Sequence, residues 1–375
     1  MILCEPTRNN DRDMGPTPKP GVLEITPYIG TRAEPAKRVH QLSANESALG
    51  PSPGAIEAFR AAGGELQFYP DGGAHELREA IGEVHGLNPE RIVCGNGSDE
   101  LLTLLADAYL RPGDEVLFSE HAFVVYRIVT LANSATPVVV PEPDLRVDVE
   151  RMLAAVTPKT RLLYVANPNN PTGTYLSGEE LRRLHAGLPP ETLLVIDAAY
   201  AEFVRRNDYE SGVEMVSQFG NVVMTRTFSK AYGLAALRVG WAFCPAAVAD
   251  VLNRVRGPYN VSLAAQRAAA AALRDRAHLE RAVAHNETWR SWLIEQVRRL
   301  GLRADDSAGN FVLIHFPARG SKTAKQADRF LATRGLMLRP VANYGLPNCL
   351  RMTVGLEAAN RAVIAALEEF MRVPG

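Results

Sequence analysis

The chain has 375 residues, of which 41 are Lys or Arg and 42 are Asp or Glu, so its formal net charge is −1. This balance, without a block of like charge, points to neither a nucleic-acid nor a membrane-surface partner, and no stretch is apolar enough for a membrane span or a signal peptide. The cysteines, Cys4, Cys94, Cys244 and Cys349, form no C-x-x-C pair, so we expect neither disulfides nor a metal site, and a cytoplasmic location fits best.

The length predicts two lobes, one large and one smaller, because a single hydrophobic core rarely spans so many residues. The start of the chain is rich in Pro, Asn, Asp and Arg, which cannot bury enough apolar surface to order themselves. Residues 1–25 are therefore expected to form a loose arm.

From about residue 90, short β-branched segments alternate with longer amphipathic ones, as in β-α-β units. Strands are expected at 91–95, 115–119, 136–140, 161–167, 192–197, 221–225 and 239–244, and helices at 98–110, 123–133, 148–155 and 178–187. Continuous apolar runs such as 193–196 predict a sheet that is buried on both faces and hence mostly parallel.

The rest of the chain predicts a bridge and a small α+β lobe. Residues 262–300 are helical in pattern, though not as one unbroken rod. Strand-like segments follow at 310–316, 335–340 and 349–355, with helices at 322–333 and 356–372. The expected fold class is α/β, with a large domain at 53–265 and a small domain built from 26–52 and 266–375.

Ligands of open α/β sheets lie beyond the carboxyl ends of the strands, so the residues after each strand are the candidates for chemistry. One strand is followed by "CGNGSDELL" (94–102), where Gly97, Ser98 and Asp99 open a helix and offer backbone N–H groups to an anion such as phosphate. The alternative is that Ser98 is a simple helix N-cap. The segment matches neither G-x-G-x-x-G nor a P-loop, which argues against a dinucleotide or a nucleoside triphosphate.

Two further loops carry polar candidates. "ANPNNPTGT" (166–174) is stiffened by two X-Pro pairs and can hold Asn170 rigidly against a ligand, or can be a plain turn. Another buried strand ends on Asp197, where an ionised carboxylate needs a partner or a function, unless it caps a helix. Tyr200 follows three residues later.

Lys230 stands in "RTFSKAYGLAALRVG" (226–240), among small, apolar and hydroxylic residues. Desolvation lowers the pKa of a lysine, and the neutral amine attacks aldehydes. Arg238, with Ser229 and the amides near Ser98, could hold a phosphate group. A lysine, a phosphate site, an aspartate and a tyrosine are together the set that pyridoxal phosphate requires.

With these residues in view, the chain resembles the fold-type I pyridoxal-phosphate-dependent aminotransferases, and most of all the branch that acts on histidinol phosphate. The likeness runs from about residue 26 to the C-terminus, through "SANESALGPSP", "FYPDGG", "GNGSDE", "NPNNPTGT", "DAAYAEF", "RTFSKAYGLAALRVG" and "NYGLPNCLRMTVG". It implies the fold-type I architecture and a transfer of the amino group between histidinol phosphate and 2-oxoglutarate in histidine biosynthesis, by a ping-pong cycle.

The resemblance also implies roles around the cofactor. Lys230 would bond to the cofactor aldehyde and move a proton between the substrate Cα and the cofactor, and Asp197 would pair with the ring nitrogen. Tyr200 and Asn170 would hydrogen-bond the ring hydroxyl, and Phe123 would stack on the ring. The residues implied around the phosphate are Gly97, Ser98, Asp99, Thr227, Ser229 and Arg238.

On the substrate side, the resemblance implies that Arg351 grips the carboxylate or phosphate, with Arg339, Asn45 and Asn170 nearby. A surface ion pair is the alternative for Arg351. Tyr69 of "FYPDGG" would reach into the phosphate cup of a neighbouring subunit, which makes the expected active unit a homodimer.

The sequence departs from many relatives at two places. Ala198 and Ala199 stand where Glu-Ala is common, and Leu49 replaces an aromatic residue. The departure at Leu49 means that an aromatic amino acid aminotransferase, acting on phenylalanine or tyrosine, also fits. A pyridoxal-phosphate-dependent decarboxylase of a phosphorylated amino acid and a non-catalytic sensor with the same fold are two further functions that the same residues allow.

Overall fold

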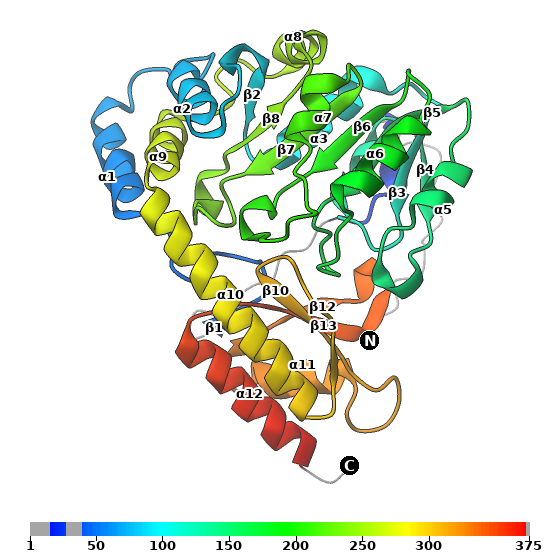
Figure 1. Cartoon of the computed structure of the whole chain (residues 1–375), viewed down its shortest axis with the longest axis vertical. Coiled ribbons are helices and arrows are strands. Elements are labelled where there is room, and N and C mark those ends of the chain that lie inside the picture. Colours follow the sequence, from blue (N-terminus) through cyan, green and yellow to red (C-terminus); the bar gives the residue numbers. More distant parts are fainter. Residues whose placement is uncertain (1–15, 28–39, 373–375) are drawn as a thin grey trace.

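The computed structural model describes residues 16–27 and 40–372, which form two lobes around separate sheets (Figure 1). The larger lobe holds a seven-stranded sheet. Its strands, in order across the sheet, are β2 (Ile92–Gly95), β8 (Gly240–Phe243), β7 (Val222–Thr227), β6 (Leu193–Asp197), β5 (Thr160–Ala166), β3 (Glu115–Ser119) and β4 (Thr136–Val140).

The sheet is mostly parallel, as the sequence predicts. Strands β4, β3, β5, β6 and β7 pair in parallel, whereas β8 runs antiparallel to both β2 and β7. Because the parallel strands end at the same edge, the loops that follow them meet there.

Both faces of the sheet are buried, since successive side chains of each strand point to opposite sides. Leu194 and Ile196 of β6 belong to one core cluster and Val195 to the other. Helices α2 (His75–His85), α5 (Val149–Ala154), α6 (Gly178–Ala186), α7 (Val213–Gln218) and α9 (Leu263–Arg274) contribute to the first cluster. Helices α3 (Ser98–Tyr109), α4 (Val125–Ala132) and α8 (Ala246–Val255) contribute to the second.

The bridge between the lobes is helical and broken once, as expected from the sequence. Helix α9 ends before Asp275, and α10 (Arg276–Arg299) continues diagonally into the lower lobe of Figure 1. Asp275 leaves the helical conformation, with ψ at 68°, and its carboxylate accepts a hydrogen bond from the amide of His278 (3.0 Å). This side-chain cap starts α10 in a new direction.

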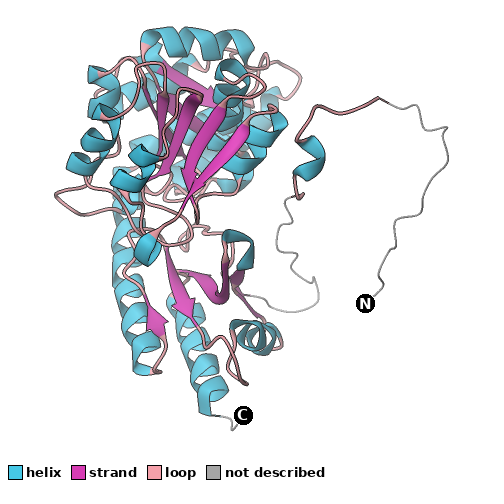
Figure 2. Ribbon diagram, turned by 90° about the vertical axis from the view of Figure 1, so that its right-hand side faces the viewer, coloured by secondary structure: helices cyan, strands magenta, loops and turns pink. Residues whose placement is uncertain are grey.

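The smaller lobe is an α+β layer. Its four-stranded sheet has the order β12 (Arg339–Val341), β13 (Leu346–Thr353), β10 (Phe311–His315) and β9 (Arg303–Ala304). Helices α10, α11 (Ala324–Ala332) and α12 (Glu357–Arg372) bury their apolar faces against it. An early segment joins this lobe, because β1 (His40–Gln41) pairs in parallel with β11 (Leu336–Met337). Figure 2 shows the two sheets in separate lobes, one above the other.

Two other early segments contact the large lobe. Helix α1 (Pro53–Ala62) packs on α9. Of the expected arm, residues 1–15 lie outside the described residues, whereas a short 3₁₀ turn at Val22–Glu24 contacts α4 and the Ser134 hydroxyl donates to the Pro20 carbonyl (2.9 Å). Within the described ranges, no helix is long and apolar enough to cross a membrane. The predicted domain boundaries stay a prediction.

Candidate active site

A cavity of about 560 Å³ lies beyond the carboxyl ends of the parallel strands. It collects side chains from loops that are far apart in sequence. The predicted site residues that line it are Asn45, Ser98, Asp99, Phe123, Asn170, Asp197, Tyr200, Thr227, Ser229, Lys230, Arg238, Arg339 and Arg351.

Lys230 lies in the loop after β7, and its half-buried side chain reaches into this cavity. Its Nζ donates a hydrogen bond to the carbonyl of Ala44 (2.9 Å). Burial, reinforced by the positive charge of Arg351, lowers the pKa of Lys230 to about 8. A neutral amine is therefore accessible close to neutral pH.

Asp197 is the last residue of β6 and is buried at the floor of the cavity. The hydroxyl of Tyr126 donates to its Oδ2 (2.8 Å), and that of Thr225 donates to Oδ1 (3.3 Å). Burial raises the pKa of Asp197 to about 6, although the Tyr126 hydrogen bond opposes this shift. The carboxylate caps no helix, so the interpretation of Asp197 as a helix cap is wrong.

A cluster of polar groups forms one end of the cavity. Arg238 donates through Nη1 to the Ser229 hydroxyl (3.2 Å) and through Nη2 to Asp99 (3.0 Å). The amide of Ser229 donates to the Thr227 hydroxyl (3.1 Å). The cluster combines hydroxyl groups and a guanidinium, which suit an oxyanion, and the Asp99 carboxylate already engages Nη2 of that guanidinium.

The start of α3 completes this end. Its N-cap is Gly97, with φ at 80°, and not Ser98, so the interpretation of Ser98 as the cap is wrong. A Cβ on Gly97 would lie 2.4 Å from Nη2 of Arg238, which means that only glycine lets the guanidinium approach the helix end. The first-turn amides of a helix have no partner within the helix and favour an anion.

The middle of the cavity carries Tyr200, Asn45 and Phe123. Asn45 donates through Nδ2 to the Tyr200 hydroxyl (2.9 Å), and its backbone amide donates to the Thr353 hydroxyl (2.9 Å). Burial raises the pKa of Tyr200 to about 12, so its hydroxyl stays protonated. Phe123 lies edge-on to Tyr126, with ring centroids 5.9 Å apart, and offers an aromatic surface to the cavity.

Two arginines form the opposite end. Arg351 of β13 is only 5% exposed, so the interpretation of this residue as part of a surface ion pair is wrong. Its guanidinium donates to the Asn170 side-chain oxygen and to the carbonyl of Ser43 (2.6 Å). Arg339 of β12 is the register partner of Arg351 across the sheet, which explains why both line the same cavity.

Tyr69 does not reach this cavity. Its side chain is 81% exposed and stacks on Tyr259, with ring centroids 4.5 Å apart. The expected contact of Tyr69 with the phosphate cup of a neighbouring subunit involves a second chain, so it stays a prediction.

Sequence reasoning missed two contributors. Tyr126 holds Asp197, and its position three residues after Phe123 at the start of a helix was the available signal. Tyr344 lines the cavity from the turn between β12 and β13, and its place in the segment "NYGLPNCLRMTVG" was the available signal. Leu49 lies in a separate small cavity with Phe203 and not in this one.

The residues present fit pyridoxal phosphate. The cradle around Gly97 and Arg238 suits its phosphate, Asp197 suits its ring nitrogen, and Lys230 suits its aldehyde, all within one cavity. These donors come from separate loops at one edge of the sheet, and the fold brings them together.

Comparison with known proteins finds relatives that share one name. Histidinol-phosphate aminotransferase from Rhodopseudomonas palustris strain TIE-1 is 56% identical over 362 residues, covering 96% of this chain and 99% of the relative. The protein of that name from Nitrobacter hamburgensis is 55% identical over 359 residues, covering 95% and 98%. The crystal structure of histidinol-phosphate aminotransferase from Sinorhizobium meliloti in complex with pyridoxal-5′-phosphate superposes with a TM-score of 0.85 at 30% identity, covering 94% of this chain and 96% of that one.

The family profile "Aminotransferase class I and II" matches residues 37–367, which include every residue of the cavity described above. The chain therefore belongs to the class I and II aminotransferases and has the fold of their pyridoxal-phosphate-dependent members.

Proposed function

We propose that this protein is a pyridoxal-phosphate-dependent aminotransferase that moves an amino group between histidinol phosphate and 2-oxoglutarate in histidine biosynthesis. The observation that carries the proposal is a lysine of lowered pKa in a cavity that has an anion cradle at one end and two arginines at the other. The names of the relatives at 55% and 56% identity support the choice of substrate.

When bound, pyridoxal phosphate supplies an aldehyde that captures amino groups and a ring that withdraws electrons from the adjacent carbon. Lys230 provides the amine for that aldehyde and the base for the proton on the substrate Cα. With a pKa of about 8, roughly a fifth of the amine is neutral at pH 7.4, against about one part in a thousand for an ordinary lysine.

Asp197 holds the proton of the ring nitrogen. Because the carboxylate is buried, a cationic partner stabilises it strongly, and the two hydroxyl donors keep it oriented. Tyr200 stays protonated and can donate to the ring hydroxyl, while Asn45 fixes its position.

Arg351 and Arg339 select the substrate. A guanidinium binds carboxylate and phosphate with the same planar geometry, so one end of the cavity can accept both reactants of a two-substrate cycle in turn. Asn170 and the carbonyl of Ser43 hold the Arg351 side chain in place before the substrate arrives.

We further propose a homodimer in the cytoplasm. The exposed Tyr69 is available for a second subunit, and the cysteines Cys94, Cys244 and Cys349 are free and buried. An exposed aromatic pair such as Tyr69 and Tyr259 is a common feature of protein interfaces.

The first prediction concerns Lys230. Borohydride treatment of the protein with pyridoxal phosphate should leave a pyridoxyl adduct on the Lys230 peptide, measured by mass spectrometry. Lys230→Ala should carry none and should lose transamination by at least about 10³-fold. The exposed Lys159→Ala variant is the control and should keep both; an adduct elsewhere in Lys230→Ala would contradict the assigned role.

The second prediction concerns the donor. In a screen with 2-oxoglutarate as acceptor, kcat/KM for histidinol phosphate should exceed that for phenylalanine by at least about tenfold, because two arginines can engage a phosphate more fully than an uncharged ring. Arg339→Gln should reduce this ratio. A higher kcat/KM for phenylalanine would favour an aromatic amino acid aminotransferase, and carbon dioxide release without an acceptor would favour a decarboxylase.

The third prediction concerns Tyr126. Removing its hydroxyl in Tyr126→Phe takes away a hydrogen bond to the ionised carboxylate, so the pKa of Asp197 should rise above its value of about 6 by roughly one unit. The affinity of the apoprotein for pyridoxal phosphate should then begin to fall at a correspondingly higher pH as the solution is made more acidic.

Tyr164→Phe is the matched control for that experiment. Tyr164 stacks on Tyr126 with centroids 4.7 Å apart, but its hydroxyl donates to the Leu102 carbonyl (3.2 Å) and not to Asp197. If both variants displaced the pH profile equally, the effect would come from packing and not from the hydrogen bond.

The fourth prediction concerns Tyr69 and uses mixed dimers. A dimer of one Tyr69→Ala chain and one Lys230→Ala chain should have one intact site if Tyr69 acts across the interface, and should regain about half of the wild-type kcat. A dimer of one wild-type chain and one double-variant chain should lack an intact site. The reverse pattern would place Tyr69 in its own subunit's site.

A further inference from the structure

A second cavity of about 550 Å³ lies on the other side of the loop that carries Asn170. Pro168 and Asn170 line the first cavity, whereas Gly173 and Thr174 of the same loop line the second. Its volume lies within the range of small-molecule sites. None of the residues assigned to the aminotransferase site lines it.

This cavity lies between the two lobes. The large lobe contributes residues 146, 173–175, 203–206 and 208, and the small lobe contributes two residues of α10 and residues 306–308. The amide of Ala308 donates to the carbonyl of Gly173 (2.8 Å), and a Cβ on Gly173 would lie 2.4 Å from the Ser307 hydroxyl oxygen. Both lobes are therefore in direct contact at its wall.

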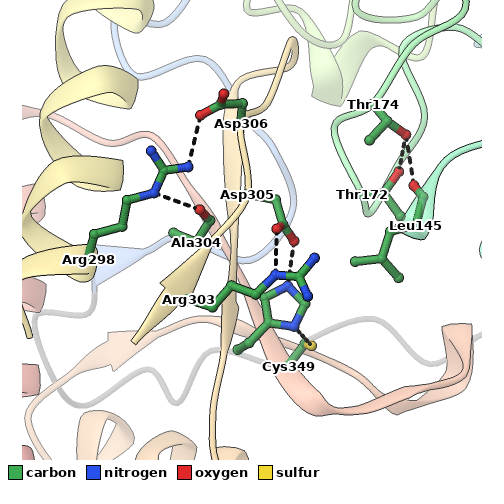
Figure 3. A network of polar contacts seen from close by, with 10 residues as sticks. Leu145, Thr172, Thr174, Arg298, Arg303, Ala304, Asp305, Asp306 and Cys349 are labelled. Carbon is green, nitrogen blue, oxygen red and sulfur yellow. Dashed lines mark hydrogen bonds and ion pairs between the residues drawn. The ribbon is translucent and has the colours of Figure 1, made fainter. Parts of the chain in front are cut away.

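Figure 3 shows how the two sides of the wall are fixed. On one side, the Thr174 hydroxyl donates to the Leu145 carbonyl (2.9 Å). On the other side, Arg298 donates to Asp306 (3.0 Å) and to the carbonyl of Ala304 (3.0 Å). Neither side needs a ligand to hold its shape.

Four guanidinium groups line the cavity, from Arg146, Arg205, Arg206 and Arg290. Arg146 and Arg205 pair with carboxylates outside the lining, Glu180 (2.6 Å) and Glu280 (2.5 Å).

Arg290 and Arg206 differ from that pair. Arg290 is only 8% exposed; it pairs with Glu287 and donates to the Gly309 carbonyl (3.3 Å). The Arg206 side chain is exposed and forms no hydrogen bond or ion pair with any residue in 16–27 or 40–372. Burial lowers the pKa of Arg290, the ion pair with Glu287 opposes this shift, and the charge of Arg206 adds a smaller lowering contribution.

The carboxylates of the cavity already have partners. Asp306 pairs with Arg298, Glu287 with Arg290, and Asp208 accepts a hydrogen bond from the Tyr175 hydroxyl (2.9 Å). Glu287 already compensates the charge of Arg290, whereas no carboxylate within residues 16–27 and 40–372 pairs with Arg206. The Arg206 guanidinium is therefore available to an anion in this cavity.

We propose that this second cavity binds a small molecule that bears oxyanion groups, phosphate or carboxylate, held by Arg206 and Arg290. Phe203, Val204 and Ala308 supply an apolar wall beside these charges. Because the ligand would touch both lobes, its binding would also stabilise their relative position.

The test is isothermal titration of the cofactor-loaded protein with pyrophosphate and, separately, with citrate. Arg206→Glu reverses an exposed charge and leaves the core intact. Arg254→Glu makes the same change in charge on an exposed arginine of α8, outside the cavity. Arg339→Gln tests whether the anion enters the catalytic cavity instead.

The expected result is binding of at least one of the two anions, weakened by about tenfold or more in Arg206→Glu and unchanged within about twofold in the Arg254→Glu and Arg339→Gln variants. The melting temperature of the wild type should rise with the anion, and that of Arg206→Glu should rise less. A preference for pyrophosphate or for citrate would identify the ligand as a phosphate or a carboxylate. Equal affinity in Arg206→Glu, loss in Arg339→Gln alone, or no binding of either anion would overturn the proposal.

Discussion

Lys230 and Arg351 reach into one cavity from different lobes. Burial of the amine and the positive charge of the nearby guanidinium together lower the pKa of Lys230. The pKa of about 8 depends on this juxtaposition, because an exposed lysine without a cationic neighbour would stay charged. The large lobe supplies the amine and the small lobe supplies the arginine. The chemistry of the site is thus a property of the assembled lobes and not of either sheet alone.

The parallel sheet explains why distant loops meet. Asp197 and Thr227 are the last residues of β6 and β7, and Asn170 lies in the loop after β5. Each of these elements was visible in the sequence, because buried parallel strands are continuous apolar runs and the polar residue that ends each run stands out. The register of β12 and β13 likewise places Arg339 beside Arg351. The family resemblance implied that these two arginines lie close together, whereas side-chain alternation along each strand does not fix the register between them.

Other parts of the structure were harder to predict from the sequence. Helices α1, α2 and α8 were not predicted, although they mix apolar and charged residues as the predicted α6 does. The hydrogen bond from Tyr126 to Asp197 joins residues 71 positions apart, and its existence depends on how α4 packs on the sheet. Ser98 was a sensible N-cap by residue type, but Gly97 takes that place because a side chain there would collide with Arg238. The Tyr126 hydrogen bond and the Gly97 cap depend on burial and on the close approach of segments that are far apart in sequence. Neither can be predicted from one segment alone.

The hydrogen bond from Lys230 to the carbonyl of Ala44 ties the reactive amine to the other lobe. Residues 40–41 pair with β11, and the carbonyl of Leu42 accepts from the Thr353 amide (2.8 Å), so the chain leading to Ala44 is anchored to the small sheet. Lys230 belongs to the loop after β7 of the large sheet, so this hydrogen bond joins the two lobes directly at the reactive amine. The orientation of the Lys230 side chain therefore depends on an atom that the small lobe holds in place.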